Sequence, residues 1–386
     1  MKSYFTYDLL IIGGGISACV FASKYLKINP RKRIGLIEAG KGLGGRSSTR
    51  ISRKFKGWKL NHGSPNLNIC NSKNTPLIKN YIDELLEKKF IKTDDSEMVL
   101  LDEGLNFEIT MNSEFSCGKN YLSLYSMSKL SQNIIGFNST KGEIDFYFET
   151  LIVDLLFNKG KWQLKSKNGV EFKSNYLICS SNLLLHKRSF EIIGINKIPL
   201  RKAIPQNKDE KIDLLLNYLD KQTFIPRLTF LIYTDDYSYK DFYKKNYRYF
   251  YLKRMLEDKY KFERVIFQLQ NNRKLGIVVL TKDVDLIHAY DKGKDEDLFK
   301  QKIFTNFNQL FANNSSINQL SGNEKMSVMK WRASQPCGSA VPFSLQLNKK
   351  YKIGFCGDWF EGEGFGRIEG SILSSLMLVN KFKNLN

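Results

Sequence analysis

The sequence predicts an α/β fold of two domains, in which both ends of the chain build one domain and the middle is inserted as a second, α+β domain. Three observations support this prediction. Residues 8–38 show the pattern of strand, glycine-rich turn, helix and strand, and residues 352–382 return to a buried strand, a glycine-rich turn and an apolar helix. The length of 386 residues exceeds the ~100–200 residues of a usual single domain.

The opening elements form a βαβ unit. Asp8–Ile12 is an apolar run typical of a buried parallel strand, and three glycines at 13–15 turn the chain into a helix over Ile16–Leu26. Pro30 lies beyond the end of that helix, and Arg33–Glu38 is the second strand. This order predicts two parallel strands joined by a crossover helix.

The following region mixes helices and strands. A helix pattern with apolar residues on one side covers Pro76–Lys89, and a weaker one covers Tyr121–Leu130. Strand patterns follow at Ile144–Phe157, Lys161–Ser166 and Tyr176–Cys179. The turns between these strands end in glycine, and one contains Asn-Gly, which predicts a β-hairpin.

Residues 195–330 are rich in Lys and Tyr and form a distinct region. Strand-like runs lie at Leu228–Tyr233, Val265–Gln270 and Leu275–Leu280, and helices are expected near 239–257 and 295–311. These patterns predict a mixed sheet with its own helices.

The chain closes with a buried strand at Lys352–Cys356 and an apolar helix over Ile368–Phe382. We therefore expect one discontinuous domain and one domain inserted into it. The first comprises residues 1–60, 140–190 and 345–386, and the inserted domain comprises residues 61–139 and 191–344.

The net charge of +21, from 60 Lys+Arg against 39 Asp+Glu, is compatible with nucleic acid, a membrane surface or an anionic ligand. The joint abundance of Lys, Asn, Ile, Tyr and Phe is also what an AT-rich coding sequence produces, and we favour that compositional origin. Three histidines and six cysteines without a C-x-x-C pair predict neither a metal site nor a disulfide framework. The chain has no run of 18 apolar residues and no clear secretory signal, so we expect a cytoplasmic protein.

The first motif is Gly13-x-Gly15-x-x-Ala18, placed between a strand and a helix. Gly13 permits the tight turn, Gly15 lets the backbone approach a pyrophosphate, and Ala18 lets the helix pack close to the strand. The backbone N–H groups of the first helical turn, at Ile16 and Ser17, face the phosphates. Glu38 ends the next strand, where an acid accepts hydrogen bonds from the adenosine ribose. This constellation predicts a Rossmann-like dinucleotide site.

The second motif follows Glu38 directly. Ala39 leads into a loop with the doublet Gly44-Gly45 followed by Arg46. Two glycines let a loop pass close to a cofactor, and Arg46 can neutralise a diphosphate. The motif resembles the second dinucleotide signature of the amine-oxidase-like flavoproteins.

The third motif joins Gly357-Asp358 to a glycine-rich loop and a helix that starts near Arg367 and Ile368. It resembles the segment that closes the FAD site in the same flavoproteins. By that resemblance, Asp358 binds the ribityl chain, and the helix directs its first N–H groups at the N1–C2=O edge of the flavin. A helix N-terminus suits the negative charge of reduced flavin.

The three motifs together resemble the renalase-like branch of the amine oxidase flavoprotein superfamily, in its bacterial and cyanobacterial form. The resemblance covers about 60 residues at each end. Where relatives show Asp-His-Gly and Trp-Arg-Tyr-Ala, this chain has Asn61-His62-Gly63 and Trp331-Arg332-Ala333-Ser334, which weakens a specific substrate assignment. The residues that carry the resemblance are Ile11–Ala18, Glu38, Gly44–Arg46, Asn61–Gly63, Trp331-Arg332 and Cys356–Gly370.

The resemblance implies non-covalent FAD in a Rossmann-like FAD-binding domain, with the inserted domain as a substrate-binding cap. It places Val153 against the adenine. His62 and Trp331 are the candidate catalytic residues, near the flavin, and an ordinary structural role is left open for all three. A thioether link to Cys337 is a disfavoured alternative. Lys325 or Lys330 could hold a water near flavin N5, although no motif selects either.

The implied function is an FAD-dependent oxidoreductase that transfers hydride from a small substrate, an amine or a dihydronicotinamide-like molecule, to flavin N5, with reoxidation by oxygen. One alternative is a membrane-associated FAD-dependent desaturase or isomerase of a polyene. Another is a basic flavoprotein that binds nucleic acid, because Tyr237–Arg264 carries nine Lys/Arg against four Asp/Glu among aromatic residues. Nucleic acid and a membrane surface are both disfavoured as partners, and the oligomeric state stays open.

Overall fold

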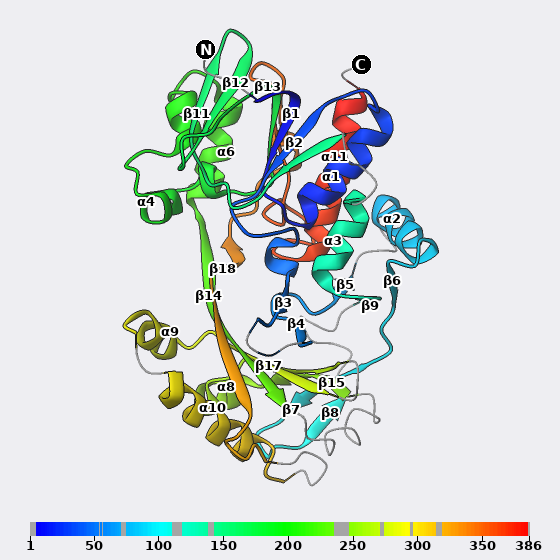
Figure 1. Cartoon of the computed structure of the whole chain (residues 1–386), viewed down its shortest axis with the longest axis vertical. Coiled ribbons are helices and arrows are strands. Elements are labelled where there is room, and N and C mark those ends of the chain that lie inside the picture. Colours follow the sequence, from blue (N-terminus) through cyan, green and yellow to red (C-terminus); the bar gives the residue numbers. More distant parts are fainter. Residues whose placement is uncertain are drawn as a thin grey trace.

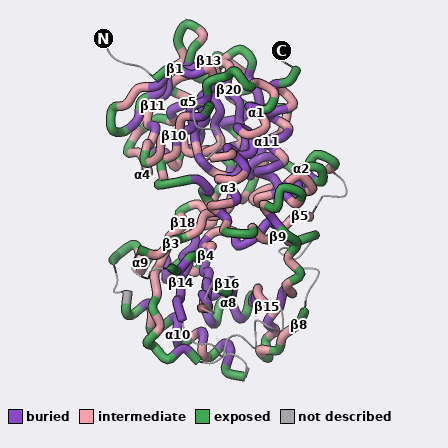
Figure 2. Tube along the Cα trace, turned by 45° about the vertical axis from the view of Figure 1, so that its right-hand side comes forward, coloured by how far each residue is buried: buried purple, intermediate pink, exposed green. Residues whose placement is uncertain are grey.

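The computed structural model divides into two halves, each built on a large β-sheet (Figure 1). Buried residues concentrate in the centre of each half (Figure 2). Both chain termini lie at the end of the upper half in Figure 1. The structure describes residues 5–53, 55, 57–70, 75–109, 118–137, 143–234, 247–270, 274–293, 296–313 and 319–384.

The first half contains a sheet whose centre is parallel. Strand β1 (Phe5–Ile12) pairs in parallel with β2 (Ile34–Ile37) on one side and with β13 (Glu171–Cys179) on the other. Strand β10 (Ile144–Tyr147) extends the sheet beyond β2, and β20 (Ile353–Phe355) pairs with the end of β13. Segments from the start, the middle and the end of the chain thus meet in one sheet, which confirms the predicted α/β class.

Antiparallel strands complete this sheet. Strand β12 (Lys161–Ser166) pairs with both β13 and β11 (Ile152–Asn158), and β19 (Leu347–Asn348) pairs with β20. The predicted single strand Ile144–Phe157 is therefore two strands on different edges of the sheet. A residue with positive φ, Glu149, lies in the turn that separates them.

Helices cover both faces of the first sheet because its strands are apolar on both sides. Leu9 and Ile11 of β1 belong to one core with α1 (Ile16–Ile28) and α11 (Ile368–Lys383). The alternate residues Leu10 and Ile12 belong to a second core. The second core includes α5 (Pro199–Ala203) and α6 (Glu210–Asp220), and α2 (Pro76–Glu87) and α3 (Met127–Ile135) join the first.

The second half is built on a seven-stranded mixed sheet in the order β18-β14-β17-β16-β15-β7-β8. Its pairs are antiparallel except β15 with β7. The long strands β14 and β18 run from this sheet toward the first half (Figure 1). The bounds are β7 Glu97–Leu101, β8 Phe107–Ile109, β14 Gln222–Thr234, β15 Tyr247–Leu252, β16 Arg264–Leu269, β17 Leu275–Thr281 and β18 Lys325–Gly338.

One face of the second sheet packs against three helices, and the other faces the first half. The helices α8 (Arg254–Tyr260), α9 (Val284–Asp291) and α10 (Glu296–Leu310) form an apolar core with the first face. Leu60 packs on the opposite face, where a Cβ on Gly276 would lie 2.1 Å from its Cδ2 atom. A glycine at this position therefore lets strand β4 (Lys59–Asn61) approach the second sheet closely.

Short strands connect the halves. Strand β3 (Thr49–Ile51) pairs with β4 (Lys59–Asn61), and a three-stranded sheet orders β5 (Leu67–Ile69), β9 (Lys119–Ser123) and β6 (Ile91–Thr93). Four short helical segments lie in loops between the larger elements. They are η1 (Gly45–Ser47), η2 (Leu183–Leu185), α4 (Arg188–Ile193) and η4 (Phe343–Leu345).

Two predicted helices are wrong in part. Within Tyr121–Leu130, residues 121–123 are the end of β9, and α3 begins only at Met127. Within 239–257, residues 247–252 form β15 and only α8 is helical, while 239–246 lie outside the described residues. Pairing with neighbouring strands overrides the local pattern in both cases.

The structure leaves two further expectations as they stand. The predicted domain division remains a prediction, since the sheets show which strands pair but fix no boundary. Among the described residues, no helix is long and apolar enough to cross a membrane. No group of three or more His, Cys, Asp or Glu side chains in this part of the chain could hold a metal ion.

Candidate functional site

A cavity of about 1290 Å³ lies between the two halves. It exceeds the ~300–1,000 Å³ of usual small-molecule pockets, so it has room for an elongated ligand. Its wall includes the residues that directly follow β1, β2 and β13 of the first sheet and residues of β14, β16, β17 and β18 of the second. The carboxyl ends of parallel strands are the usual ligand-binding edge of such a sheet.

The turn after β1 combines a strained glycine with an open one. Gly13 has φ +102°, and a Cβ there would lie 2.7 Å from the Oγ atom of Ser180. Both facts require glycine. A Cβ on Gly15 would meet no atom of the protein within 4 Å, because this residue faces the cavity. The first helical turn of α1, at Ile16 and Ser17, also lines the cavity, and no side chain caps its N-terminus.

A second glycine loop lies beside the first. The N–H of Gly44 donates to the carbonyl oxygen of Gly14 at 2.9 Å, and Gly15 and Gly44 form an isolated parallel bridge. Gly44 and Gly45 have φ +123° and +51°, and a Cβ on Gly45 would lie 3.1 Å from the Cα of Gly15. The two motifs predicted separately from the sequence therefore form one continuous backbone surface on the cavity.

The Glu38 carboxylate lies at the end of β2 between these loops. Its Oε2 atom accepts a hydrogen bond from the N–H of Gly14 at 2.6 Å, and its Oε1 atom accepts one from Gly40 at 2.5 Å. Glu38 lines the cavity, whereas its neighbour Ala39 is exposed and does not. The predicted acid thus lies at the cavity beside the nucleotide turn.

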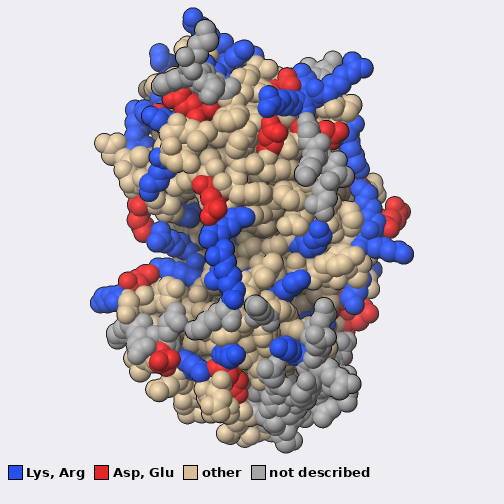
Figure 3. All heavy atoms as spheres, in the orientation of Figure 1, with Lys and Arg blue, Asp and Glu red and all other residues tan. Residues whose placement is uncertain are grey.

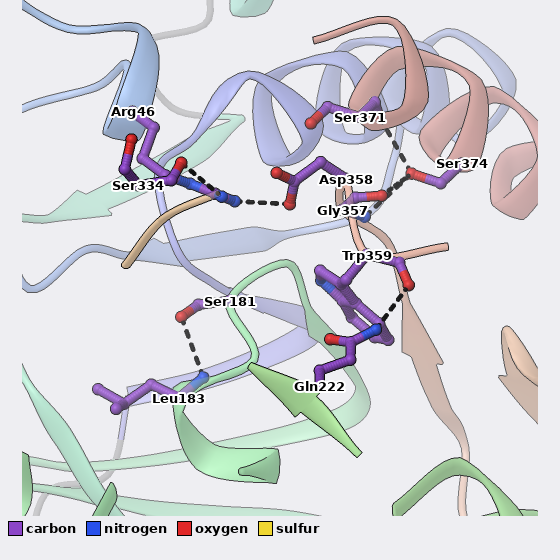
Figure 4. A network of polar contacts seen from close by, with 10 residues as sticks. All are labelled: Arg46, Ser181, Leu183, Gln222, Ser334, Gly357, Asp358, Trp359, Ser371 and Ser374. Carbon is purple, nitrogen blue, oxygen red and sulfur yellow. Dashed lines mark hydrogen bonds and ion pairs between the residues drawn. The ribbon is translucent and has the colours of Figure 1, made fainter. Parts of the chain in front are cut away.

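Arg46 and Asp358 form an ion pair at the cavity wall, with 2.6 Å between Nη2 and Oδ1 (Figure 4). Arg46 also donates to the carbonyl oxygen of Ser334 at 3.3 Å. The Asp358 side chain is 6% exposed and that of Arg46 is 40% exposed. Sequence reasoning assigned both residues to a cofactor but did not foresee that they bind one another.

The N-terminus of α11 opens into the same cavity. Arg367, Ile368 and Ser371 line it, and no side chain caps the helix. A Cβ on Gly370 would lie 2.2 Å from the carbonyl oxygen of Gly364, so the preceding loop presses against the helix. Gly357 is held by Ser374, whose hydroxyl accepts from its N–H at 2.9 Å and donates to its carbonyl oxygen at 2.8 Å (Figure 4). Two helix N-termini therefore reach one cavity.

His62 and Trp331 stack at the cavity wall with ring centroids 5.0 Å apart. The indole N–H donates to the carbonyl oxygen of His62 at 3.3 Å. Burial, together with the positive charge of Arg50, lowers the pKa of His62 from 6.5 to about 4. His62 is therefore neutral at physiological pH.

Asn61, the first residue of the Asn61-His62-Gly63 segment, holds this segment in place. Its backbone N–H donates to the Oε1 atom of Gln268 at 2.9 Å, and the Nε2 atom of Gln268 returns a bond to the Asn61 carbonyl oxygen at 2.8 Å. Its side-chain Oδ1 accepts from the Thr49 hydroxyl and from the N–H of Met127. The Asn61 side chain thus supplies an acceptor at the start of α3.

Several residues selected from the sequence do not line the cavity. Ala18 is fully buried behind the turn, and Val153 lies in β11 away from the wall, so adenine contact by Val153 remains a prediction. Lys330 is paired with Asp291, and Lys325 lies over the ring of Phe55. Cys337 is also outside the lining.

The second half contributes residues that sequence reasoning missed. Phe224, Arg227, Tyr251 and Arg264 come from three strands of the second sheet, and Arg188 comes from the start of α4. No motif marks these positions, because only the folded sheet brings them together. Among the described lining residues, Lys and Arg outnumber Asp and Glu by eight to three.

Comparisons with known proteins agree with this geometry. Residues 11–85 match the NAD(P)-binding Rossmann-like domain family. No curated protein matches the chain. A putrescine oxidase triple mutant superposes with a TM-score of 0.69 at 9% identity, covering 100% of both chains.

Two further solved structures show the same similarity. Wild-type putrescine oxidase bound to putrescine gives a TM-score of 0.67 at 9% identity over 99% of this chain and 100% of that one. A protein assigned as a protoporphyrinogen oxidase from Exiguobacterium sp. 255-15 gives 0.65 at 10% identity over 100% of both chains. At such identities the likeness shows the fold: the chain has the two-domain fold of these oxidases.

Proposed function

We propose that the protein is an FAD-dependent oxidoreductase that takes hydride from a small substrate. The observation that carries the proposal is the convergence of two uncapped helix N-termini, those of α1 and α11, on one large cavity. Helix N-termini favour anionic groups, and FAD offers a diphosphate at its centre and a negatively charged ring when reduced. The fold of putrescine oxidase supports the same assignment.

The adenosine half of FAD fits the α1 end of the cavity. Gly15 leaves open the space that a side chain would fill, so a pyrophosphate can approach the backbone there. The carboxylate of Glu38 lies one strand away, where it would bind the ribose hydroxyls. An acid at this position disfavours a 2′-phosphate on that ribose.

The flavin half fits the α11 end. Asp358 would bind the ribityl chain while Arg46 keeps its charge compensated. When bound, the flavin supplies the chemistry, by accepting a hydride at N5. The residues of the chain would orient the substrate and exclude water, with neutral His62 and Trp331 as one wall. An amine or a dihydronicotinamide-like molecule is the proposed substrate, with oxygen as the oxidant.

The two rival functions find little support in the described residues. A nucleic-acid-binding flavoprotein would need exposed aromatic rings between the charges of 237–264. The rings in the described part of that segment are mostly buried, with Tyr249, Phe250 and Phe262 at most 1% exposed. Lys and Arg are spread over the face in Figure 3 and do not gather in one patch. A polyene enzyme at a membrane rests only on the shared FAD motifs.

Purification tests the proposal. The protein should be yellow and should release FAD, and not FMN, into the supernatant when it is denatured. Colour that stays on the precipitate would support a thioether to Cys337, and a colourless protein that takes up no FAD would refute the proposed function. Anaerobic bleaching of the flavin across amines, dihydronicotinamides and polyenes would then identify the substrate class.

A further inference from the structure

The cavity wall contributed by the second half and by the start of α4 carries an excess of positive charge. Arg188, Arg227 and Arg264 line it, together with Tyr251 and Phe224. The acids of the cavity lie elsewhere: Glu38 and Asp358 belong to the proposed FAD site, and Glu363 lies on the exposed loop before α11. A ligand next to this wall therefore meets cations and no described carboxylate that lines the cavity.

Two of these arginines lie beside the same carboxylate. The Nε and Nη2 atoms of Arg227 donate to the two carboxylate oxygens of Glu263 at 2.6 and 2.8 Å. Arg264 lies 3.9 Å from the same carboxylate. Because one carboxylate stands between two guanidinium groups, the buried group of three carries a net positive charge at the cavity.

Arg188 has an aromatic ring as its partner. Its guanidinium lies 4.4 Å from the ring centroid of Phe224, and among the described residues it forms no ion pair. Burial, together with the nearby charge of Arg46, lowers its pKa to about 10, so it stays protonated at neutral pH. A guanidinium stacked on a ring keeps its N–H edge available for a bidentate oxyanion.

Two of the aromatic rings near this wall already have partners. Arg188 covers Phe224, and His62 covers one face of Trp331. A cationic amine could therefore be held neither by a carboxylate of this wall nor by the face of Phe224. This contrasts with putrescine oxidase, whose structure holds the diamine putrescine.

From this arrangement we infer that the substrate of the proposed FAD enzyme is an anion, whose carboxylate or phosphate oxygens bind Arg188 and the wall formed by Arg227 and Arg264. The inference rests on the proposed function, because it assigns the substrate class of the same cavity. This substrate class favours a phosphorylated dihydronicotinamide or an organic acid over a cationic amine.

The test uses the FAD-loaded protein, so that the cofactor occupies its own anion site. Benzoate, inorganic phosphate, benzamide and benzylammonium are titrated at constant ionic strength, and the flavin absorption difference spectrum is recorded. We expect saturable binding of benzoate or phosphate and none of benzylammonium. Benzoate alone would indicate a carboxylate site, and phosphate alone a phosphate site.

The variant Arg188→Gln should lower the affinity for the anion by roughly 10–150-fold, the range of one charge-assisted hydrogen bond. Its FAD content should be unchanged. Lys187→Gln is the matched control, because Lys187 is adjacent but pairs with Asp220 at 3.2 Å on the surface. Arg188→Lys keeps the charge without the planar fork and should weaken binding less than Arg188→Gln. This second variant keeps the test decisive if Arg188→Gln does not fold.

Three outcomes would overturn the inference: tighter binding of benzylammonium or benzamide than of both anions, no binding of either anion to flavin-loaded protein, or equal losses in Arg188→Gln and Lys187→Gln. Loss of FAD from Arg188→Gln with unchanged anion binding would also overturn it, since Arg188 would then serve the cofactor. Failure of the proposed function is distinguishable, because the purified protein would then show no flavin spectrum at all.

Discussion

Glu38 shows how one side chain serves both the fold and the proposed ligand. Its two oxygens accept hydrogen bonds from the N–H groups of Gly14 and Gly40, so the carboxylate ties the nucleotide turn to the following loop. A carboxylate has about four lone-pair sites, and these two bonds leave acceptor capacity for ribose hydroxyls. The residue is therefore oriented before any ligand arrives.

The variant Glu38→Ala should bind FAD roughly 10–150-fold more weakly, because a charge-assisted hydrogen bond contributes ~1.5–3 kcal/mol. Titration of the flavin-free protein with FAD, followed by flavin fluorescence, measures the change. Glu87→Ala, at an exposed position of α2, is the control and should leave the affinity unchanged. An unaltered affinity in Glu38→Ala would mean that the carboxylate only ties the two loops.

His62 makes the stability of the protein depend on pH. Its pKa is 6.5 in an unfolded chain and about 4 in the fold, where burial disfavours the charged ring. Below about pH 6.5 the unfolded state therefore takes up a proton that the folded state does not. The stability that this residue contributes at pH 7 is lost as the pH falls from about 6.5 to about 4, by ~3 kcal/mol in total.

Urea unfolding of wild type and His62→Asn between pH 7.5 and 4 tests this expectation. The wild type should lose ~3 kcal/mol more of its free energy of unfolding over this range than the variant does. His288→Asn changes an exposed histidine and should follow the wild type. Parallel curves for wild type and His62→Asn would show that His62 is not held neutral.

At the scale of elements, the turn between β1 and α1 contains two glycines with different roles: the fold requires Gly13, and the proposed ligand requires Gly15. Gly13 needs a left-handed backbone and has no room for a Cβ, whereas Gly15 has an extended backbone and faces open space. An alanine methyl at Gly15 would therefore meet the ligand and not the protein. A side chain at position 13 would therefore disturb the fold, and one at position 15 would disturb only the ligand.

We expect Gly15→Ala to keep the wild-type melting temperature within about 2 °C without FAD, since its methyl meets no protein atom. FAD affinity should fall at least tenfold, a loss of ~1.4 kcal/mol or more, because the methyl occupies the path of the pyrophosphate. Gly13→Ala is the contrast and should lower both the melting temperature and the affinity. Normal FAD binding by Gly15→Ala would place the pyrophosphate elsewhere.

At the scale of the whole molecule, the cavity is a property of neither half alone. Leu60 packs against Gly276 of the second sheet, and the Gln222 side chain donates to the carbonyl oxygen of Trp359 at 3.1 Å (Figure 4). These contacts fix the spacing of the two walls. A ligand that touches both walls should therefore stabilise the folded molecule as one unit.

FAD added to flavin-free protein at 100 times its dissociation constant should raise the free energy of unfolding by ~2.7 kcal/mol. FMN at the same concentration should raise it less, because FMN lacks the adenosine that would reach Glu38. Calorimetry of the protein with each flavin makes the comparison. Equal stabilisation by FAD and FMN would show that the α1 end of the cavity does not bind adenosine.

The sequence by itself predicted the glycine loops and the acid that line one end of the cavity. Motifs at Gly13–Ala18, Glu38 and Gly44–Arg46 are local, and each residue type follows from a turn, a helix N-terminus or a strand end a few residues away. The return of the chain to the same sheet was also predictable, because Lys352–Cys356 has the apolar pattern of a buried strand.

Only the tertiary structure shows which residues form the rest of the cavity. The pairing of Arg46 with Asp358 joins residues more than 300 positions apart, and the wall of Arg188, Arg227 and Arg264 is assembled from separate elements. Tyr247–Leu252 is a strand because β7 and β16 pair with it, which no local pattern reveals. Contacts between distant segments depend on strand register and sheet packing, and these are set by the burial of the whole core and not by the residues nearby in sequence.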